Sequence, residues 1–154
     1  MKRFGHLNRD ISRVLASMGH TDSLVIADCG LPVPAGVECI DVSFARGDPG
    51  FLRVLETILA DFMVERAVFA WETRDQNPSV DIRASALAHE GVQVEFVTHE
   101  RLKEMTRAAR AIIRTGEATA YSNVILFSQV VFAHATRNEG NQQIVRPGES
   151  AGGS

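Results

Sequence analysis

Short apolar runs alternate along this chain with segments in which apolar residues recur every three or four positions. Continuous apolar runs of this length are typical of strands buried on both faces of a sheet. The expected strands are Ser23–Ala27, Ala67–Trp71, Val92–Val97 and Asn123–Phe132. In Val92–Val97 apolar and polar residues alternate, so this strand should have one polar face. This alternation of strands and helices predicts an α/β fold with three layers, α/β/α, and a largely parallel, possibly mixed, central sheet.

The helical segments carry recognisable start signals. Within Asn8–Met18 the apolar residues follow the period of one helix face, and the first residue is a good N-cap. Asp48-Pro49 predicts the N-cap and first position of a second helix. Asn77-Pro78 opens another helix, whose apolar positions include Ile82. The stretch Arg110–Arg114 fits either more helix or a short strand.

Length and composition predict one globular domain, which we place at residues 1–132 of the 154. Residues 133–154 are mostly small and polar, and we expect this tail to be disordered. The net charge of −3 indicates neither nucleic-acid nor anionic membrane binding. No apolar stretch approaches the roughly 20 residues of a membrane helix. The two cysteines, Cys29 and Cys39, form no C-x-x-C pair and suit a reducing compartment, so we expect a cytoplasmic protein.

Polar residues that could carry chemistry lie at the junctions between the predicted elements. The motifs of dinucleotide, phosphate and serine hydrolase sites are absent from the sequence. His20 follows the first helix, and Asp28 ends the first strand. His99 and Lys103 share a helix face after a later strand, and Tyr121-Ser122-Asn123 precedes the last one. Because open α/β sheets bind ligands beside the carboxyl ends of their strands, these residues could hold a neutral polyol and move protons near neutral pH.

Each candidate also has a plain structural interpretation. His20 can be an exposed residue behind a helix C-terminus, and Asp28 can be an Asx-turn residue that starts the proline loop. His99 can belong to the first turn of a helix, with Lys103 on its solvated face. Tyr121 can be a core or interface residue. A metal site formed by His20, Asp28 and His99 lacks the spacing of known ligand pairs, so we expect no metal.

Several short strings stand in register with those of a known family. They are Leu7-Asn8, Asp10-Ile11-Ser12, G-H-T-D-S-L-V-I-A-D-C-G-L-P-V-P at 19–34, T-H-E at 98–100, I-R-T-G-E at 113–117 and Y-S-N-V-I-L at 121–126. Through them the chain resembles the RbsD/FucU family over residues 1–132. The G-L-P-V-P variant favours the ribose branch of that family over its fucose branch.

The resemblance implies a cytoplasmic isomerase that needs no cofactor and interconverts the β-pyranose and β-furanose forms of D-ribose. It also implies a ring-shaped homo-oligomer, typically a decamer, with each site between neighbouring subunits. Two alternatives stay open: a mutarotase for L-fucose or a related monosaccharide, and a non-catalytic sugar-binding module. His6 and the tail after Phe132 depart from the family pattern, and we assign them no role.

The resemblance also implies roles for the candidate residues. By position, His20 matches the proton donor of the family, and Asp28, His99 and Tyr121-Ser122-Asn123 match its sugar-binding positions. Lys103 falls near a basic contact of some members. Ring opening moves one proton from the anomeric hydroxyl and another to the ring oxygen, and a histidine with an ordinary pKa of ~6.5 can serve both directions. Asp28 would either bind sugar hydroxyls or orient His20, and both roles stay open.

Overall fold

The computed structural model describes residues 1–129, whose strands form one six-stranded sheet. The strands are β1 (Ser23–Ala27), β2 (Glu38–Asp41), β3 (Val64–Ala70), β4 (Gln93–Val97), β5 (Ala111–Arg114) and β6 (Val124–Ser128). The helices are α1 (Arg9–Ser17), α2 (Phe51–Leu59), α3 (Trp71–Gln76), α4 (Pro78–His89) and α5 (His99–Met105), followed by a 3₁₀ turn at Thr106–Ala108. None of the described helices is long and apolar enough to cross a membrane.

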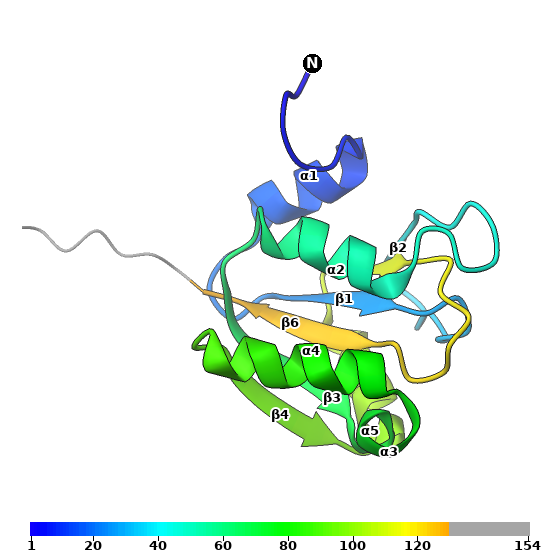
Figure 1. Cartoon of the computed structure of the whole chain (residues 1–154). Helices are drawn as coiled ribbons and strands as arrows, with labels where there is room; N and C mark the ends of the chain where they lie inside the picture. The colour runs from blue at the N-terminus through cyan, green and yellow to red at the C-terminus, as the bar shows by residue number, and fades with distance from the viewer. Residues whose placement is uncertain (130–154) are drawn as a thin grey trace, which may run out of the picture.

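The sheet is mixed, as the sequence allowed. Its strand order is β2-β5-β1-β6-β3-β4, and β6 runs antiparallel to both of its neighbours. The other neighbouring strands pair in parallel, so all strands except β6 end at the same edge of the sheet. This carboxyl edge lies on the right in Figure 1, where the loops that follow β1 and β5 come together.

Helices cover both faces of the sheet, which confirms the three-layer α/β/α architecture. On one face α1, α2 and α4 pack against the strands, and Phe51 and Leu87 are buried there against residues such as Leu24. On the other face α5 covers the strands, and Leu102 packs in a cluster that includes Val25. Leu24 and Val25 are adjacent in β1 and serve opposite faces because side chains alternate along a strand.

Local capping signals predicted the starts of two helices correctly. The side-chain oxygen of Asn8 accepts hydrogen bonds from the amides of Asp10 and Ile11, both at 2.9 Å, so it caps α1. Asn77 is the N-cap of α4, which begins at Pro78. These signals succeed because an N-cap satisfies the helix amides that have no partner within the helix.

The second helix begins later than the sequence predicted. The carbonyl oxygen of Asp48 accepts hydrogen bonds from the amides of Phe44 and Ala45, at 2.9 and 3.0 Å. The backbone of Asp48 therefore closes a tight turn and cannot start a helix. Gly50 is the N-cap instead, and α2 starts at Phe51.

Two apolar residues that were assigned to buried positions lie at the surface. Ile82 is 70% exposed, because the buried stripe of α4 runs through Val80, Ala84 and Leu87. Trp71, predicted as the end of a strand, instead begins α3 and is 50% exposed.

The sequence did not predict β2 or α3, and β5 resolves the ambiguity at Arg110–Arg114 in favour of a strand. β2 is a short edge strand in which Ile40 alone is buried, so it has no apolar run. α3 has six residues and no side-chain cap. The predicted strand end at Phe132 and the predicted disordered tail, 133–154, lie outside the described residues.

Candidate active site

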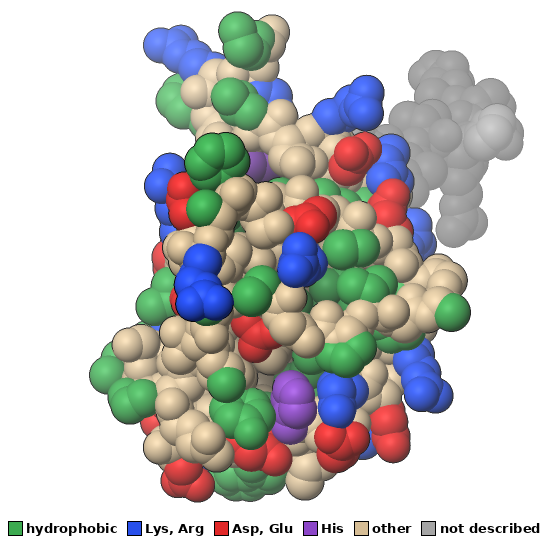
Figure 2. Space-filling view, turned by 90° about the vertical axis from the view of Figure 1, so that its right-hand side faces the viewer, with side chains coloured by type: hydrophobic (Ala, Val, Ile, Leu, Met, Phe, Trp, Pro, Cys, Tyr) green, Lys and Arg blue, Asp and Glu red, His purple; other side chains and the backbone are tan. Residues whose placement is uncertain are grey.

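A pocket of about 360 Å³ lies at the carboxyl edge of the sheet. Its walls come from the loop after β1, the start of α5 and the loop between β5 and β6. The lining residues are Asp28, Cys29, Gly30, Leu31, His99, Glu117, Ala118, Ala120 and Tyr121. Figure 2 views the molecule from this edge, where acidic, basic and hydrophobic side chains of the described residues are interspersed.

Asp28 is nine-tenths buried, and its carboxylate is held in place by two donors. One oxygen accepts a hydrogen bond from the amide of Gly30 at 3.0 Å, which forms an Asx turn. The other oxygen accepts from Nδ2 of Asn123 at 3.1 Å, and Oδ1 of Asn123 accepts from the amide of Asp28 at 3.0 Å. Asp28 therefore starts the proline loop and also lines the pocket, so its two interpretations are compatible.

His99 and Tyr121 also line the pocket and contact each other. Their rings meet edge to face, with 5.2 Å between centroids and an interplanar angle of 87°. His99 is the first residue of α5, and its amide donates to a carboxylate oxygen of Glu72 at 3.0 Å. The Nδ1 atom of His99 is buried and has no hydrogen-bond partner among the described residues.

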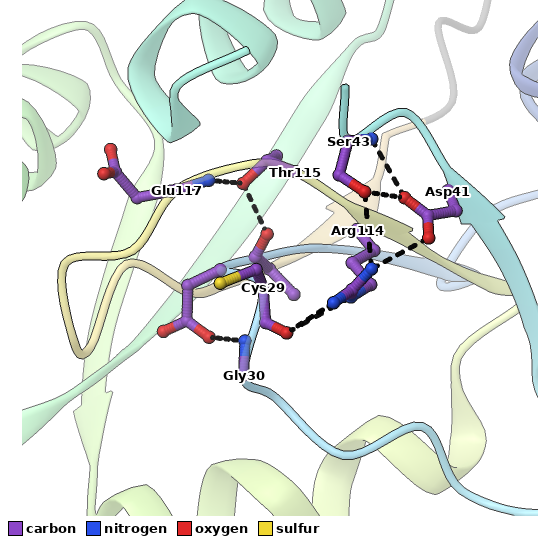
Figure 3. Close-up of polar contacts among 9 residues, drawn as sticks. Cys29, Gly30, Asp41, Ser43, Arg114, Thr115 and Glu117 are labelled. Atoms are coloured by element: carbon purple, nitrogen blue, oxygen red, sulfur yellow. Dashed lines mark hydrogen bonds and ion pairs between the residues drawn. The ribbon is translucent and has the colours of Figure 1, made fainter. Parts of the chain in front are cut away.

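Arg114, at the end of β5, ties the loop that carries the pocket to the neighbouring strand ends (Figure 3). Its guanidinium donates twice to the carbonyl oxygen of Cys29, at 3.2 and 3.0 Å, and once to Asp41 at 2.9 Å. The pKa of Asp41 lies below its ordinary value, mainly because Ser43 donates hydrogen bonds to its carboxylate. The hydrogen bond and the positive charge of Arg114 lower this pKa further. Thr115 adds a hydrogen bond from its hydroxyl to the last carbonyl of β1 at 2.8 Å. The wall of the pocket thus rests on β1, β2 and β5.

Three of the predicted sugar-binding residues do not line the pocket: Lys103, Ser122 and Asn123, which is fully buried behind Asp28. Lys103 faces an adjoining hollow of about 580 Å³ between α5 and residues 32–35. Its ammonium group contacts the carboxylate of Glu100 at 2.6 Å, and this contact lowers the pKa of Glu100. Ser122 is 1% exposed and lies behind the pocket wall, where its hydroxyl accepts a hydrogen bond from Asn77 at 2.8 Å.

His20 lies at the opposite edge of the sheet from the pocket. It precedes β1 whereas Asp28 follows it, and the five residues of β1 span roughly 17 Å. The imidazole is about half exposed, with Nε2 3.2 Å from a carboxylate oxygen of Glu65. Within one chain Asp28 therefore does not orient His20. The same separation excludes a metal site formed by His20, Asp28 and His99 of one chain.

Sequence reasoning missed Glu117, which lines the pocket. Its carboxylate accepts a hydrogen bond from the amide of Phe51, the first residue of α2, at 3.3 Å. The available signal was the string I-R-T-G-E, which places Glu117 directly after the carboxyl end of β5. That signal was weak because the sequence left β5 undecided between helix and strand.

Comparisons with known proteins agree with this fold. The model of the RbsD / FucU transport protein family matches residues 1–131. The D-ribose pyranase of Chromobacterium violaceum is 62% identical over 132 residues, which are 86% of this chain and 100% of the relative. The D-ribose pyranase of Halalkalibacterium halodurans is 54% identical over the same shares of the two chains.

Solved structures extend the comparison to three dimensions. The structure of Bacillus subtilis RbsD complexed with D-ribose matches with a TM-score of 0.82 and 41% identity, over 86% of this chain and 100% of that one. The fucose mutarotase of Streptococcus pneumoniae, in complex with L-fucose, matches with a TM-score of 0.67 and 23% identity, over 82% and 95%. At that identity the second match shows a shared fold only.

Proposed function

The chain belongs to the RbsD/FucU family, and from that premise we propose that it interconverts the β-pyranose and β-furanose forms of D-ribose. Two relatives that are 62% and 54% identical are named D-ribose pyranase, which supports the ribose branch. The observation that carries the proposal is the convergence of Asp28, His99 and Tyr121 on one pocket at the carboxyl edge of the sheet. These side chains offer an acceptor, a proton-transfer group and a hydroxyl to the same ligand.

The chemistry of ring exchange suits groups of these types. The anomeric hydroxyl must lose a proton and the ring oxygen must gain one, after which a different hydroxyl closes the new ring. Positioned proton transfer of this kind typically accelerates a reaction by ~10²–10⁴-fold. In this proposal His20 donates the proton to the ring oxygen. Asp28, His99 and Tyr121 contact the sugar hydroxyls, and Asn123 acts through its hydrogen bond to Asp28.

The pocket suits a small neutral sugar. Its volume of about 360 Å³ lies at the small end of the range for ligand pockets. A neutral sugar offers no charge, so selectivity depends on polar groups that a wrong sugar would leave unpaired. The carboxylate of Asp28, which lines the pocket, is such a group. We propose that Lys103 also contributes to sugar binding, from the hollow that adjoins the pocket. Ser122 contributes indirectly, because it supports the pocket wall.

We further propose that each site is completed by a second copy of the chain. His20 lies on the edge opposite the pocket, so the proton donor of one subunit must come to the pocket of its neighbour. This arrangement requires a homo-oligomer that is closed by rotation, such as a ring or a decamer made of two rings. The free thiols of Cys29 and Cys39 are compatible with the reducing cytoplasm, where we place the reaction.

Saturation-transfer NMR on ribose solutions tests the proposed activity directly. With the protein present, magnetisation should pass between the pyranose and furanose signals of D-ribose faster than in buffer. His20→Ala should slow this exchange by about 10²–10⁴-fold while the variant keeps most of its affinity for ribose. L-Fucose, measured in the same way, should show little or no acceleration.

The other outcomes separate the remaining functions. Acceleration for L-fucose and not for D-ribose would replace the proposal with a fucose mutarotase. Ribose binding without any acceleration would indicate a sugar-binding module, because a pure binder has no exchange rate for His20→Ala to reduce.

A further inference from the structure

Tyr121 has a backbone conformation that its bulky side chain disfavours. Its φ is 63°, in the left-handed region where residues other than glycine are uncommon. Such conformations persist only where the surrounding structure enforces them, and they are concentrated at ligand sites. Groups outside the pocket must therefore hold this residue.

Three hydrogen bonds from α3 and from the residue between α3 and α4 hold residues 120–122, two through backbone carbonyls and one through the side chain of Ser122. The hydroxyl of Thr73 donates to the carbonyl oxygen of Tyr121 at 3.1 Å. The side-chain amide of Asn77 donates to the carbonyl oxygen of Ala120 at 3.0 Å and to the hydroxyl of Ser122 at 2.8 Å. Thr73, Asn77 and Ser122 are at most 4% exposed, so water does not compete for these bonds.

Capping of α4 does not explain why residue 77 is an asparagine. Its Oδ1 accepts a hydrogen bond from the amide of Val80 at 3.4 Å, a role that Ser or Asp fills equally well. Asparagine alone among these three residue types also carries an amide with two donor hydrogens. Both of its contacts through that amide are to residues that flank Tyr121.

We propose that Asn77, with Thr73, is a positioning residue that sets the place of the Tyr121 ring in the pocket and thereby the affinity for the sugar. The rings of Tyr121 and His99 pack against each other in the lining of the pocket, so a shift of the 120–122 backbone would move both rings relative to Asp28. The identity of the sugar rests on the proposed function, whereas the hydrogen bonds that position Tyr121 do not.

Two variants and a matched control test this role. Asn77→Ser keeps a capping oxygen for α4 but is too short to reach the 120–122 backbone, and Thr73→Val keeps its shape without the hydroxyl. Asn8→Ser makes the same change at the N-cap of α1, away from the pocket. Because the chain contains one tyrosine, fluorotyrosine labelling gives a single fluorine NMR signal that reports on Tyr121.

We expect Asn77→Ser and Thr73→Val to shift or broaden that signal and to raise the KM for D-ribose about tenfold, with kcat nearly unchanged, because binding is lost equally from substrate and transition state. Asn8→Ser should change neither quantity. A purely structural role would instead lower kcat at constant KM, since fewer molecules would be folded. That pattern, or wild-type signals in both variants, would overturn the inference.

The experiment also separates this inference from the proposed function. A wild-type protein without ribose exchange would refute the function, and the fluorine signal would still test the contact to Tyr121. If circular dichroism shows that Asn77→Ser does not fold, the volume-conserving Thr73→Val decides the question.

Discussion

At the scale of single residues, the pair formed by Asp28 and Asn123 links the fold to the pocket. Asn123 is fully buried, and both ends of its side-chain amide are occupied by the backbone and carboxylate of Asp28. The two residues are 95 positions apart in the chain, and they join the carboxyl end of β1 to the start of β6. A carboxylate that is fixed in this way can accept sugar hydroxyls without reorganising first.

Removal of the Asn123 side chain should therefore affect both stability and binding. Asn123→Ala leaves the amide of Asp28 and one carboxylate oxygen buried without a partner, which should cost about 1–3 kcal/mol in the free energy of unfolding. Urea denaturation measures this cost, and calorimetry should show weaker ribose binding. Thr119→Ala, in the exposed part of the same loop, is the control, and we expect it to cost less than about 0.5 kcal/mol. Equal costs for the two variants would contradict the role assigned to the pair.

At the scale of elements, α3 and α4 show how a short segment can support a distant site. α3 follows β3 directly and places Glu72 against the amide of His99 and Thr73 against the carbonyl of Tyr121. Asn77, between the two helices, contacts the same loop while it caps α4. The six residues of α3 therefore support both His99 and Tyr121 in the lining of the pocket.

The orientation of α4 makes a second test possible. Leu87 is 1% exposed, in agreement with its predicted place on the apolar face of the helix, whereas Ile82, predicted on the same face, is 70% exposed. Leu87→Ala should cost about 2–5 kcal/mol of unfolding free energy, whereas Ile82→Ala should cost well under 1 kcal/mol. Chemical denaturation of the two variants measures the difference. An equally large cost at Ile82 would show that another surface, such as a second copy of the chain, covers it.

At the scale of the whole molecule, the proposed donor and the pocket lie at opposite edges of one sheet. His20 precedes β1 and Asp28 follows it, so no side-chain rearrangement within a folded chain brings them together. The sugar-binding groups and the proton donor therefore belong to different copies of the chain in the proposed enzyme. Activity and assembly should then be inseparable.

Subunit mixing tests this arrangement. His20→Ala and Asp28→Ala should each be almost inactive, because one lacks the donor and the other lacks the acceptor. When equal amounts are refolded together, about a quarter of the sites should combine an intact His20 from one subunit with an intact Asp28 from its neighbour, so ring exchange should return to about that fraction. Native mass spectrometry checks that mixed oligomers form. Mixed oligomers without recovered activity would contradict a shared site.

Local signals along the chain were enough to predict several of its elements. The N-cap and apolar periodicity of α1 and the apolar run of β1 each lie within a few residues, and such patterns predicted the fold class. The short strings shared with the RbsD/FucU family are equally local, and they predicted the pocket residues Asp28, His99 and Tyr121. β2 was missed because a short edge strand with Ile40 as its one buried residue has no apolar run. Ile82 was misplaced because α4 has an apolar pattern too weak to define one face.

The order and direction of the strands, and with them the geometry of the site, follow from long-range packing and could not be predicted from local patterns. The insertion of β6 between β1 and β3 and the reach of Asn77 to residues 120 and 122 both depend on contacts between segments far apart in the chain. Periodicity and capping act over a few residues, whereas strand order results from burial of the whole core at once, so no single segment encodes it.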